Sequence, residues 1–129
     1  IKPSKAIKMC IENNVPADHI TMSSDGNGSM AVYNKSGKVE RLGVTTLDSL
    51  HEEFKDAVLC EGLDISTAVK VITENVAKTL NLYPLKGSIG IGSDADIVLL
   101  NKQLEIEYVF AKGKKFMDDR KVIKKGTFE

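Results

Sequence analysis

The spacing of the apolar residues changes near residue 84, and this change limits the folds that are open to the chain. Before that point, two segments at about 47–59 and 66–80 carry apolar residues at helical spacing, which predicts two helices. From about residue 95, apolar and polar residues alternate, which predicts a small antiparallel meander of strands. The sequence therefore predicts a mixed α/β chain in two parts, residues 1–84 and residues 85–129.

The ends of the helices are predicted from their capping residues. Ser4 is the expected N-cap of a short helix near the N-terminus. Asp64 or Ser66 is the expected N-cap of the helix at 66–80, and Gly62 lies beyond the C-terminus of the helix before it. Each long helix has an apolar stripe that we expect to be buried, formed by Leu47, Leu50, Phe54, Ala57 and Val58 in the first helix and by Ala68, Val69, Ile72, Val76 and Leu80 in the second.

A single strand is predicted within the helical part, at Ile20–Ser24, and it leads directly into a glycine-rich loop. The two glycines of this loop allow its main chain to approach another group closely. Asn34–Lys38 then has the composition of a turn and predicts the tip of a hairpin. A strand, a loop at its carboxyl end and helices after it are typical of the last unit of a (β/α)8 barrel. A whole barrel needs about 200 residues or more, so we expect these 129 residues to hold only part of one.

Composition and charge argue against several kinds of partner. The chain has 18 Lys and Arg residues against 18 Asp and Glu residues, whereas nucleic-acid-binding domains carry a basic excess, so no nucleic-acid partner is expected. No apolar run approaches the roughly 18 residues of a membrane helix, so no membrane partner is expected either. Cys10 and Cys60 lack the spacing of a metal site, and we expect them to be free thiols in a cytoplasmic protein.

Three stretches of the sequence carry a family resemblance: residues 20–29, residues 72–80 with 87–98, and the ending 125–129. The first and third resemble the isoaspartyl dipeptidases of the amidohydrolase superfamily, and the second is similar to a junction found across that superfamily. The resemblance implies the C-terminal fragment of a metal-dependent hydrolase TIM barrel, with the last βα unit and the following helices in residues 1–84. Residues 85–129 would then supply strands of a small β-sandwich domain.

The same resemblance implies a reaction and a set of site residues. Enzymes of this family hydrolyse β-aspartyl dipeptides, with a metal-bound hydroxide attacking the isopeptide carbonyl. They hold two metal ions, usually zinc, through a His-x-His, a modified lysine, two further histidines and one aspartate. Only the aspartate is matched, by Asp25, which would ligate a metal and carry a proton from the attacking water to the leaving amine. Ser29 matches a serine that contacts the carboxylate end of the substrate, whereas His19 and His51 match no ligand.

The resemblance also implies what the isolated chain lacks. The other metal ligands would lie in a missing N-terminal portion of the barrel. We therefore expect the chain alone to be inactive and to bind no catalytic zinc, because a zinc site needs three or four protein ligands. We expect the parent enzyme to be a homo-oligomer.

Other interpretations remain open from the residues alone. Asp25 could simply start a turn, since Asp-Gly is common in turns, although the whole run from Ser23 to Ser29 favours a site. Asp94 and Asp96 are assigned to a turn and to the start of a strand rather than to catalysis. The parent could be another amidohydrolase, dihydroorotase-like or deacetylase-like, or the chain could be a non-catalytic binding or structural domain.

Overall fold

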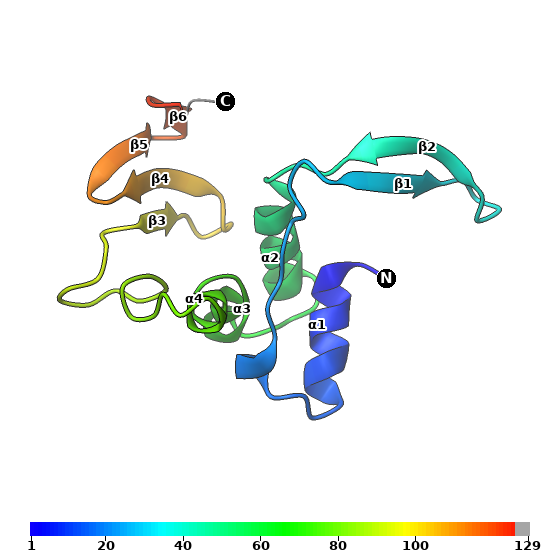
Figure 1. The fold of residues 1–129 in the computed structure, drawn as a ribbon, viewed down its shortest axis with the longest axis horizontal. Helices are drawn as coiled ribbons and strands as arrows, with labels where there is room; N and C mark the ends of the chain where they lie inside the picture. Colours follow the sequence, from blue (N-terminus) through cyan, green and yellow to red (C-terminus); the bar gives the residue numbers. More distant parts are fainter. Residues whose placement is uncertain (126–129) are drawn as a thin grey trace. The chain divides into compact units, whose positions relative to one another are not determined.

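The computed structural model describes residues 1–125, in two compact units divided between Val76 and Ala77 (Figure 1). The expected similarity at residues 126–129 therefore lies outside the described residues. The first unit contains α1 (Pro3–Glu12), a 3₁₀ helix η1 (Ala17–His19), β1 (Ser29–Tyr33), β2 (Val39–Val44), α2 (Ser49–Leu59) and α3 (Ile65–Ile72). Helix α4 (Glu74–Thr79) crosses the division, and the second unit contains β3 (Ile97–Leu100), β4 (Ile106–Ala111), β5 (Lys114–Asp118) and β6 (Lys121–Val122). The prediction of a mixed α/β chain is confirmed.

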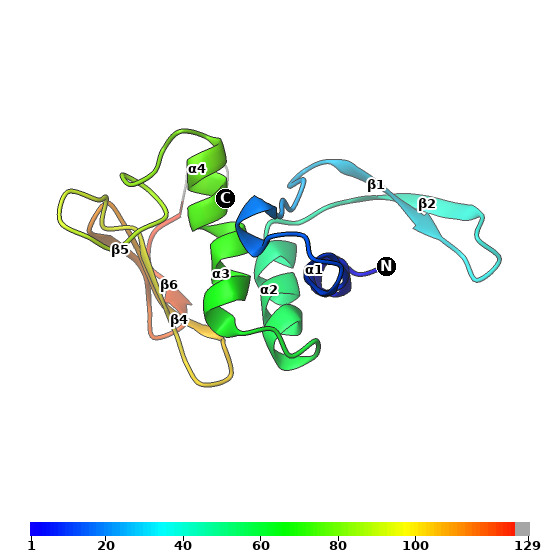
Figure 2. The same ribbon diagram turned by 90° about the horizontal axis from the view of Figure 1, so that it is seen from below.

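Helices α1, α2 and α3 lie side by side in the first unit (Figure 2). The second long helix that the sequence predicts is broken at Thr73, whose φ of −129° and ψ of −85° are not helical. Val71 and Asn75 are buried, whereas the predicted core residues Val69 and Leu80 are exposed. Val69 and Val71 precede the break, so the buried face of α3 itself differs from the predicted stripe, and Leu80 lies beyond the end of α4. Leu47 is also exposed, since it lies before α2 begins. The other buried apolar side chains of this unit are Ile7, Phe54, Ala57 and Ala68.

The first turn of α1 is capped by a side chain from α2, and the prediction of Ser4 as its N-cap is wrong. Pro3 is the first helical residue, and Ser4 is fully buried inside the first turn. The main-chain N–H of Ser4 donates to Glu53 Oε2 at 2.9 Å, and Lys2 Nζ lies 2.6 Å from Asp56 Oδ2. A tertiary contact thus satisfies a group that a local cap would otherwise satisfy. The prediction of Asp64 as a cap is confirmed, because its side chain accepts from the N–H of Thr67 in α3.

Residues 20–24 form an extended segment that leads into the turn at Asp25. The prediction of a strand here is wrong in one respect: no strand partner pairs with residues 20–24 anywhere in residues 1–125. The burial nevertheless alternates as in a strand, with Ile20, Met22 and Ser24 half-buried and the residues between them exposed. The N–H of Met22 donates to the Val71 carbonyl at 3.2 Å. A β ladder needs a neighbouring strand, and here helical residues take its place.

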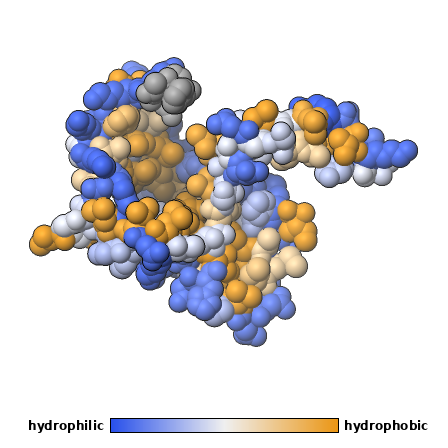
Figure 3. Space-filling model, viewed as in Figure 1, coloured by the Kyte–Doolittle hydropathy of each residue, from blue (hydrophilic) through white to orange (hydrophobic). Residues whose placement is uncertain are grey.

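The predicted hairpin is confirmed, and it projects from the helices of the first unit (Figure 1). Strands β1 and β2 pair antiparallel, and their turn is closed by the side chain of Asn34, which accepts from the N–H of Ser36 at 3.0 Å. Apolar and polar residues are interspersed along this hairpin, the arm at the right of Figure 3. Tyr33, Leu42 and Val44 are more than 60% exposed.

The second unit contains the predicted meander. Strands β3, β4, β5 and β6 form one antiparallel sheet in chain order. Before the sheet, Lys86 forms ion pairs with both Asp94 and Asp96, and Asp96 also accepts from the N–H of Lys112 at 2.7 Å. The hydrogen bonds from Lys86 and then from Lys112 hold the pKa of Asp96 below its ordinary value. These two carboxylates therefore serve the local structure. None of the helices in residues 1–125 is long and apolar enough to cross a membrane.

Replacing Asn75 with Asp should destabilise the first unit strongly. The buried Asn75 amide donates to the carbonyls of Ala17 and Ile20, each at 2.8 Å, and a carboxylate cannot donate to either. We expect the free energy of unfolding to fall by about 3 kcal/mol, measured by urea denaturation. Asn13→Asp is the matched control, because the Asn13 amide donates to the Met9 carbonyl in an exposed position. Asn13→Asp should lower the free energy of unfolding by less than about 1 kcal/mol. Equal losses of stability in the two variants would contradict the prediction.

Candidate functional site

The loop after the extended segment is a tight turn that runs from Asp25 to Gly28. The N–H of Gly28 donates to the Asp25 carbonyl at 2.8 Å. Asp25 and Asn27 have φ angles of 48° and 66°, in the left-handed region that Asp and Asn tolerate better than most residues. The side chain of Ser23 accepts from the N–H of Asp25 at 3.2 Å. Asp25 therefore does begin a turn, and its carboxylate lies in an exposed position.

The carboxylate of Asp25 lies against the α-carbon of Gly28. A Cβ atom added to Gly28 would be 2.6 Å from Asp25 Oδ2 and 2.8 Å from the Asp25 carbonyl oxygen, closer than real Cβ atoms come. The sequence predicts that this loop approaches another group closely, and in the structure that group is the Asp25 side chain of the same loop. At Gly26, an added Cβ would instead meet the flexible end of the Leu47 side chain.

Thr45, which follows β2, closes the loop from the opposite side. Its main-chain N–H donates to the Gly28 carbonyl at 3.0 Å, and its carbonyl accepts from the N–H of Asn27 at 3.0 Å. Its hydroxyl donates to the carbonyls of Asp25 and Gly28. The composition of the loop did not indicate Thr45, which lies 20 positions after Asp25. The hairpin register could have revealed it, because Ser29 pairs with Val44 and the next position along places Thr45 opposite Gly28.

Ser29 is the first residue of β1, and it lies directly after the turn that Asp25 begins. It is exposed, and its Cα partner across the hairpin is Val44. The structure thus places the two predicted site residues at the two ends of one short loop. Both are open to solvent, where they can reach a ligand.

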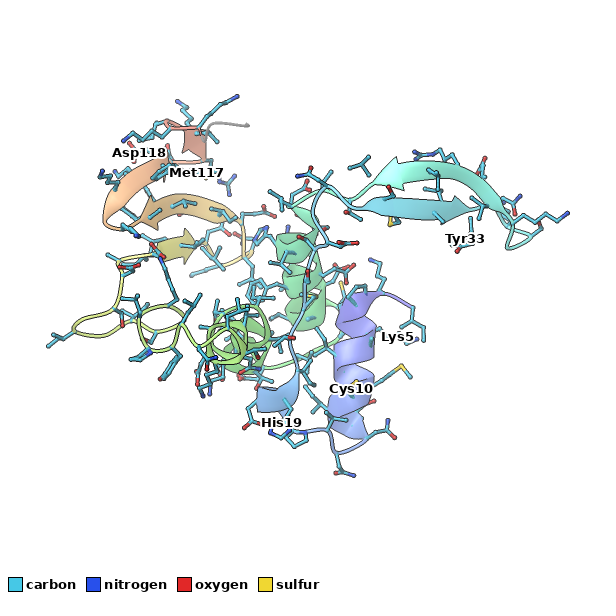
Figure 4. The ribbon with its side chains drawn as sticks, in the orientation of Figure 1. Lys5, Cys10, His19, Tyr33, Met117 and Asp118 are labelled. Carbon is cyan, nitrogen blue, oxygen red and sulfur yellow. The ribbon has the colours of Figure 1, made fainter. Side chains whose placement is uncertain are left out.

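The histidines lie elsewhere in the chain. His19 belongs to η1 (Figure 4), which precedes the extended segment, whereas Asp25 follows that segment. Five residues lie between the two, and six steps of extended chain correspond to about 20 Å. His51 lies on α2, stacked on Phe54. No group of three or more His, Cys, Asp or Glu residues that could hold a metal ion occurs within residues 1–125.

A shallow hollow of about 230 Å³ adjoins the loop. Ser23, Ser24 and Thr45 line it on the side of the loop, and residues from α1, β1 and α2 complete its walls. It is smaller than the roughly 300–1,000 Å³ of typical ligand pockets. In this structure the loop therefore lies at an open surface with a small recess beside it.

Comparison with known proteins gives one family and several relatives. The model of the amidohydrolase family matches residues 2–126. A solved β-aspartyl dipeptidase from Fervidobacterium islandicum AW-1, in complex with a β-Asp-Leu dipeptide, is 33% identical, with a TM-score of 0.80 over 98% of this chain and 33% of that one. An imidazolonepropionase from Kosmotoga olearia is 51% identical over 53 residues, 40% of this chain and 13% of the relative. A dihydropyrimidinase from Rattus norvegicus is 54% identical over 37 residues, 29% of this chain and 7% of the relative. The chain thus spans about a third of the solved dipeptidase and a smaller share of the two enzymes.

Replacing Gly28 with Ala should move the Asp25 carboxylate. The new methyl group would contact a carboxylate oxygen and a main-chain carbonyl, so the turn has to open. We expect the free energy of unfolding to fall by about 1–3 kcal/mol and the ¹³C chemical shift of the Asp25 carboxyl carbon to change. Gly43→Ala is the control, since the nearest atom to its added Cβ is Val32 Cγ2 at 3.5 Å, an ordinary contact. An unchanged carboxyl signal in Gly28→Ala would mean that Gly28 does not hold this side chain.

Proposed function

Because the chain belongs to the amidohydrolase family, we propose that it is the C-terminal part of a metal-dependent β-aspartyl dipeptidase. The observation that carries the proposal is the similarity of nearly the whole chain to the F. islandicum dipeptidase, in structure and in sequence together. The loop from Asp25 to Ser29 supports it, because it presents an exposed carboxylate at one end and an exposed serine at the other.

In this proposal, residues 1–84 form the end of a (β/α)8 barrel and residues 85–129 form part of a small β-sandwich domain. The burial of residues 20–25 supports the barrel assignment. The half-buried and the exposed residues alternate along this segment, as the two faces of a barrel strand do. The half-buried residues are Ile20, Met22 and Ser24, and the exposed ones are Thr21, Ser23 and Asp25. In the proposed barrel, the exposed set would face the interior. Asp25 then lies at the carboxyl end of the strand, where barrel enzymes have their active sites.

The residues of this chain fit only a part of the zinc site that the family implies. Asp25 offers one oxygen ligand, and residues 1–125 contain no cluster that completes a site. The remaining ligands of the two zinc ions would come from the preceding portion of the parent barrel. Zinc, when bound, supplies Lewis-acid chemistry that makes hydroxide available near neutral pH. A parent sequence with a His-x-His about 200 or more residues before Asp25 would support this assignment.

Asp25 would act as metal ligand and proton carrier in the hydrolysis. A carboxylate oxygen of Asp25 accepts a proton from the attacking water as the new C–O bond forms at the isopeptide carbonyl. The same proton then passes to the nitrogen of the leaving amino acid as the C–N bond breaks, so the carboxylate is regenerated. An exposed carboxylate on a loop held by its own main-chain hydrogen bonds suits this role, because the group must reach both the water and the amine.

Ser29 would bind the carboxylate end of the substrate. Its exposed hydroxyl can donate one hydrogen bond to a carboxylate oxygen. Ser29 lies at the end of the turn that Asp25 begins. One loop would therefore both bind the substrate and carry the proton from the attacking water to the leaving nitrogen. A site of this kind should favour dipeptides with a free carboxylate over blocked ones.

A second candidate is another amidohydrolase activity, dihydroorotase-like or deacetylase-like. The matches to an imidazolonepropionase and a dihydropyrimidinase are short, but their sequence identity is higher than that of the match to the dipeptidase. These two matches favour keeping the second candidate. The full-length protein that carries this chain should be assayed with β-Asp-Leu and with a dihydropyrimidine under identical conditions. Turnover of β-Asp-Leu alone supports the proposal, and turnover of the dihydropyrimidine alone favours a dihydroorotase-like activity. Turnover of neither substrate by the metal-loaded protein counts against both of these activities.

Replacing Asp25 with Asn in the full-length enzyme should lower kcat for β-Asp-Leu by at least about 10²-fold, because Asn cannot accept the proton of the attacking water. KM should change much less, since Asp25 acts on the water rather than on the substrate's binding groups. Steady-state kinetics and metal analysis on the same sample are the measurements. A near-normal kcat with the metal bound would show that Asp25 is only a turn residue.

Replacing Ser29 with Ala should show the opposite balance. We expect KM to rise about tenfold and kcat to change less, because one hydrogen bond to a charged group is lost from substrate binding. The same assay with β-Asp-Leu amide, which has no free carboxylate, provides the control. The Ser29→Ala effect should be much smaller on the amide, and an equal effect on both substrates would place Ser29 away from the carboxylate.

A further inference from the structure

Thr45 lies at the end of the hairpin, outside the loop that carries the two proposed site residues. We propose that Thr45 is a positioning residue, whose hydroxyl holds Asp25 and Ser29 at a fixed separation during the reaction. This inference rests on the proposed function. The residues between Asp25 and Thr45 leave the loop, run out along β1, return along β2 and meet the loop again at Thr45.

The contacts of Thr45 are concentrated on one short stretch of main chain. Its N–H and its carbonyl pair with Gly28 and Asn27, each at 3.0 Å, which continues the hairpin ladder by one residue. The hydroxyl adds a contact that no ladder requires. It has one proton, yet the carbonyls of Asp25 and Gly28 both lie within reach, the second at 3.2 Å. The shared proton draws these two carbonyls toward a single point, so it constrains the turn between them.

This constraint extends to the Asp25 carboxylate by two routes. The first is the main chain of Asp25 itself, whose φ of 48° is sparsely populated for residues other than glycine and persists when surrounding contacts hold it. The second is Gly28, which leaves room for the carboxylate at its α-carbon. Thr45 binds the carbonyl oxygens of both residues. Loosening Thr45 should therefore let the carboxylate turn away from its present direction.

The same anchor sets the position of Ser29. Gly28 precedes Ser29 in β1, and Val44 pairs with Ser29 directly before Thr45 in β2. A group that fixes Gly28 therefore also fixes where β1 begins. In the proposed reaction, Asp25 carries the proton and Ser29 holds the substrate, so the distance between them decides whether the proton reaches the leaving nitrogen.

The test uses the full-length protein with three substitutions. Thr45→Val keeps the branched shape that suits a strand end and removes only the hydroxyl. Thr45→Ser restores a hydroxyl at the same position. Thr46→Val makes the same chemical change at the exposed neighbouring threonine. The readouts are hydrogen–deuterium exchange of a peptide that covers residues 24–30, with a β4 peptide as reference, and steady-state kinetics with β-Asp-Leu.

We expect Thr45→Val to raise exchange in the loop peptide about fivefold, the effect of losing roughly one hydrogen bond, with no change in β4. We expect kcat to fall about tenfold with the metal content unchanged, because a misplacement of about 1 Å can cost about 10²-fold and the loop is loosened rather than displaced. Thr45→Ser should recover both readouts to within about threefold of the wild type, and Thr46→Val should match the wild type.

Each of the contrary results has a distinct meaning. Unchanged exchange in Thr45→Val overturns the inference whatever the kinetics show. Raised exchange with unchanged kcat overturns the positioning role, and a failure of Thr45→Ser to recover would mean that side-chain volume matters rather than the hydroxyl. If the wild-type enzyme does not hydrolyse β-Asp-Leu, the proposed function and with it the catalytic part of this inference are wrong, while the exchange readout still decides whether the hydroxyl holds the loop.

Discussion

The buried amide of Asn75 holds the segment on which the whole candidate site depends. It donates to the carbonyls of Ala17 and Ile20, so it fixes the chain where the extended segment begins. At the other end, Thr45 holds the turn through contacts that are only partly buried. Water competes better for exposed hydrogen bonds than for buried ones, so the two anchors differ in strength. The segment is therefore fixed firmly at its start and more weakly at Asp25.

The extended segment is also where neighbouring strands of the proposed barrel would be added. Its covered side is held by the Val71 carbonyl, while residues 20–24 have no strand partner within residues 1–125. An extended segment without a strand partner offers main-chain groups for pairing, as a strand of the proposed barrel would before its neighbours are added. The hairpin adds exposed Leu42 and Val44 to the surface of the same unit. Both features agree with a chain that spans about a third of the solved dipeptidase.

Local sequence signals predicted the elements that local contacts stabilise. The hairpin tip at Asn34–Lys38, the meander after residue 95 and the Asp64 cap follow from turn composition, alternation and capping chemistry, and the structure contains all three. The break at Thr73 was not predictable, because apolar spacing continues through it. The cap that Glu53 provides to α1 was not predictable either, since Glu53 and Ser4, whose N–H it accepts from, lie 49 positions apart. At the site, the composition of the loop indicated Asp25 and Ser29, but their roles remain predictions.

The hydrogen bonds that close the loop come from residues 23–45. Ser23 and the Gly28 N–H bind the main chain of Asp25, and Thr45 binds Asn27 and Gly28. None of these contacts needs a metal ion or a residue from elsewhere in a barrel. The relation between Asp25 and Ser29 is thus set by this part of the chain, whereas the metal ligands other than Asp25 would come from another part of the proposed enzyme. The hairpin then has a clear physical role, because its two strands bring Thr45 back to the turn. A change in the hairpin can therefore reach Asp25, the proposed proton carrier, without altering the Asp25 side chain itself.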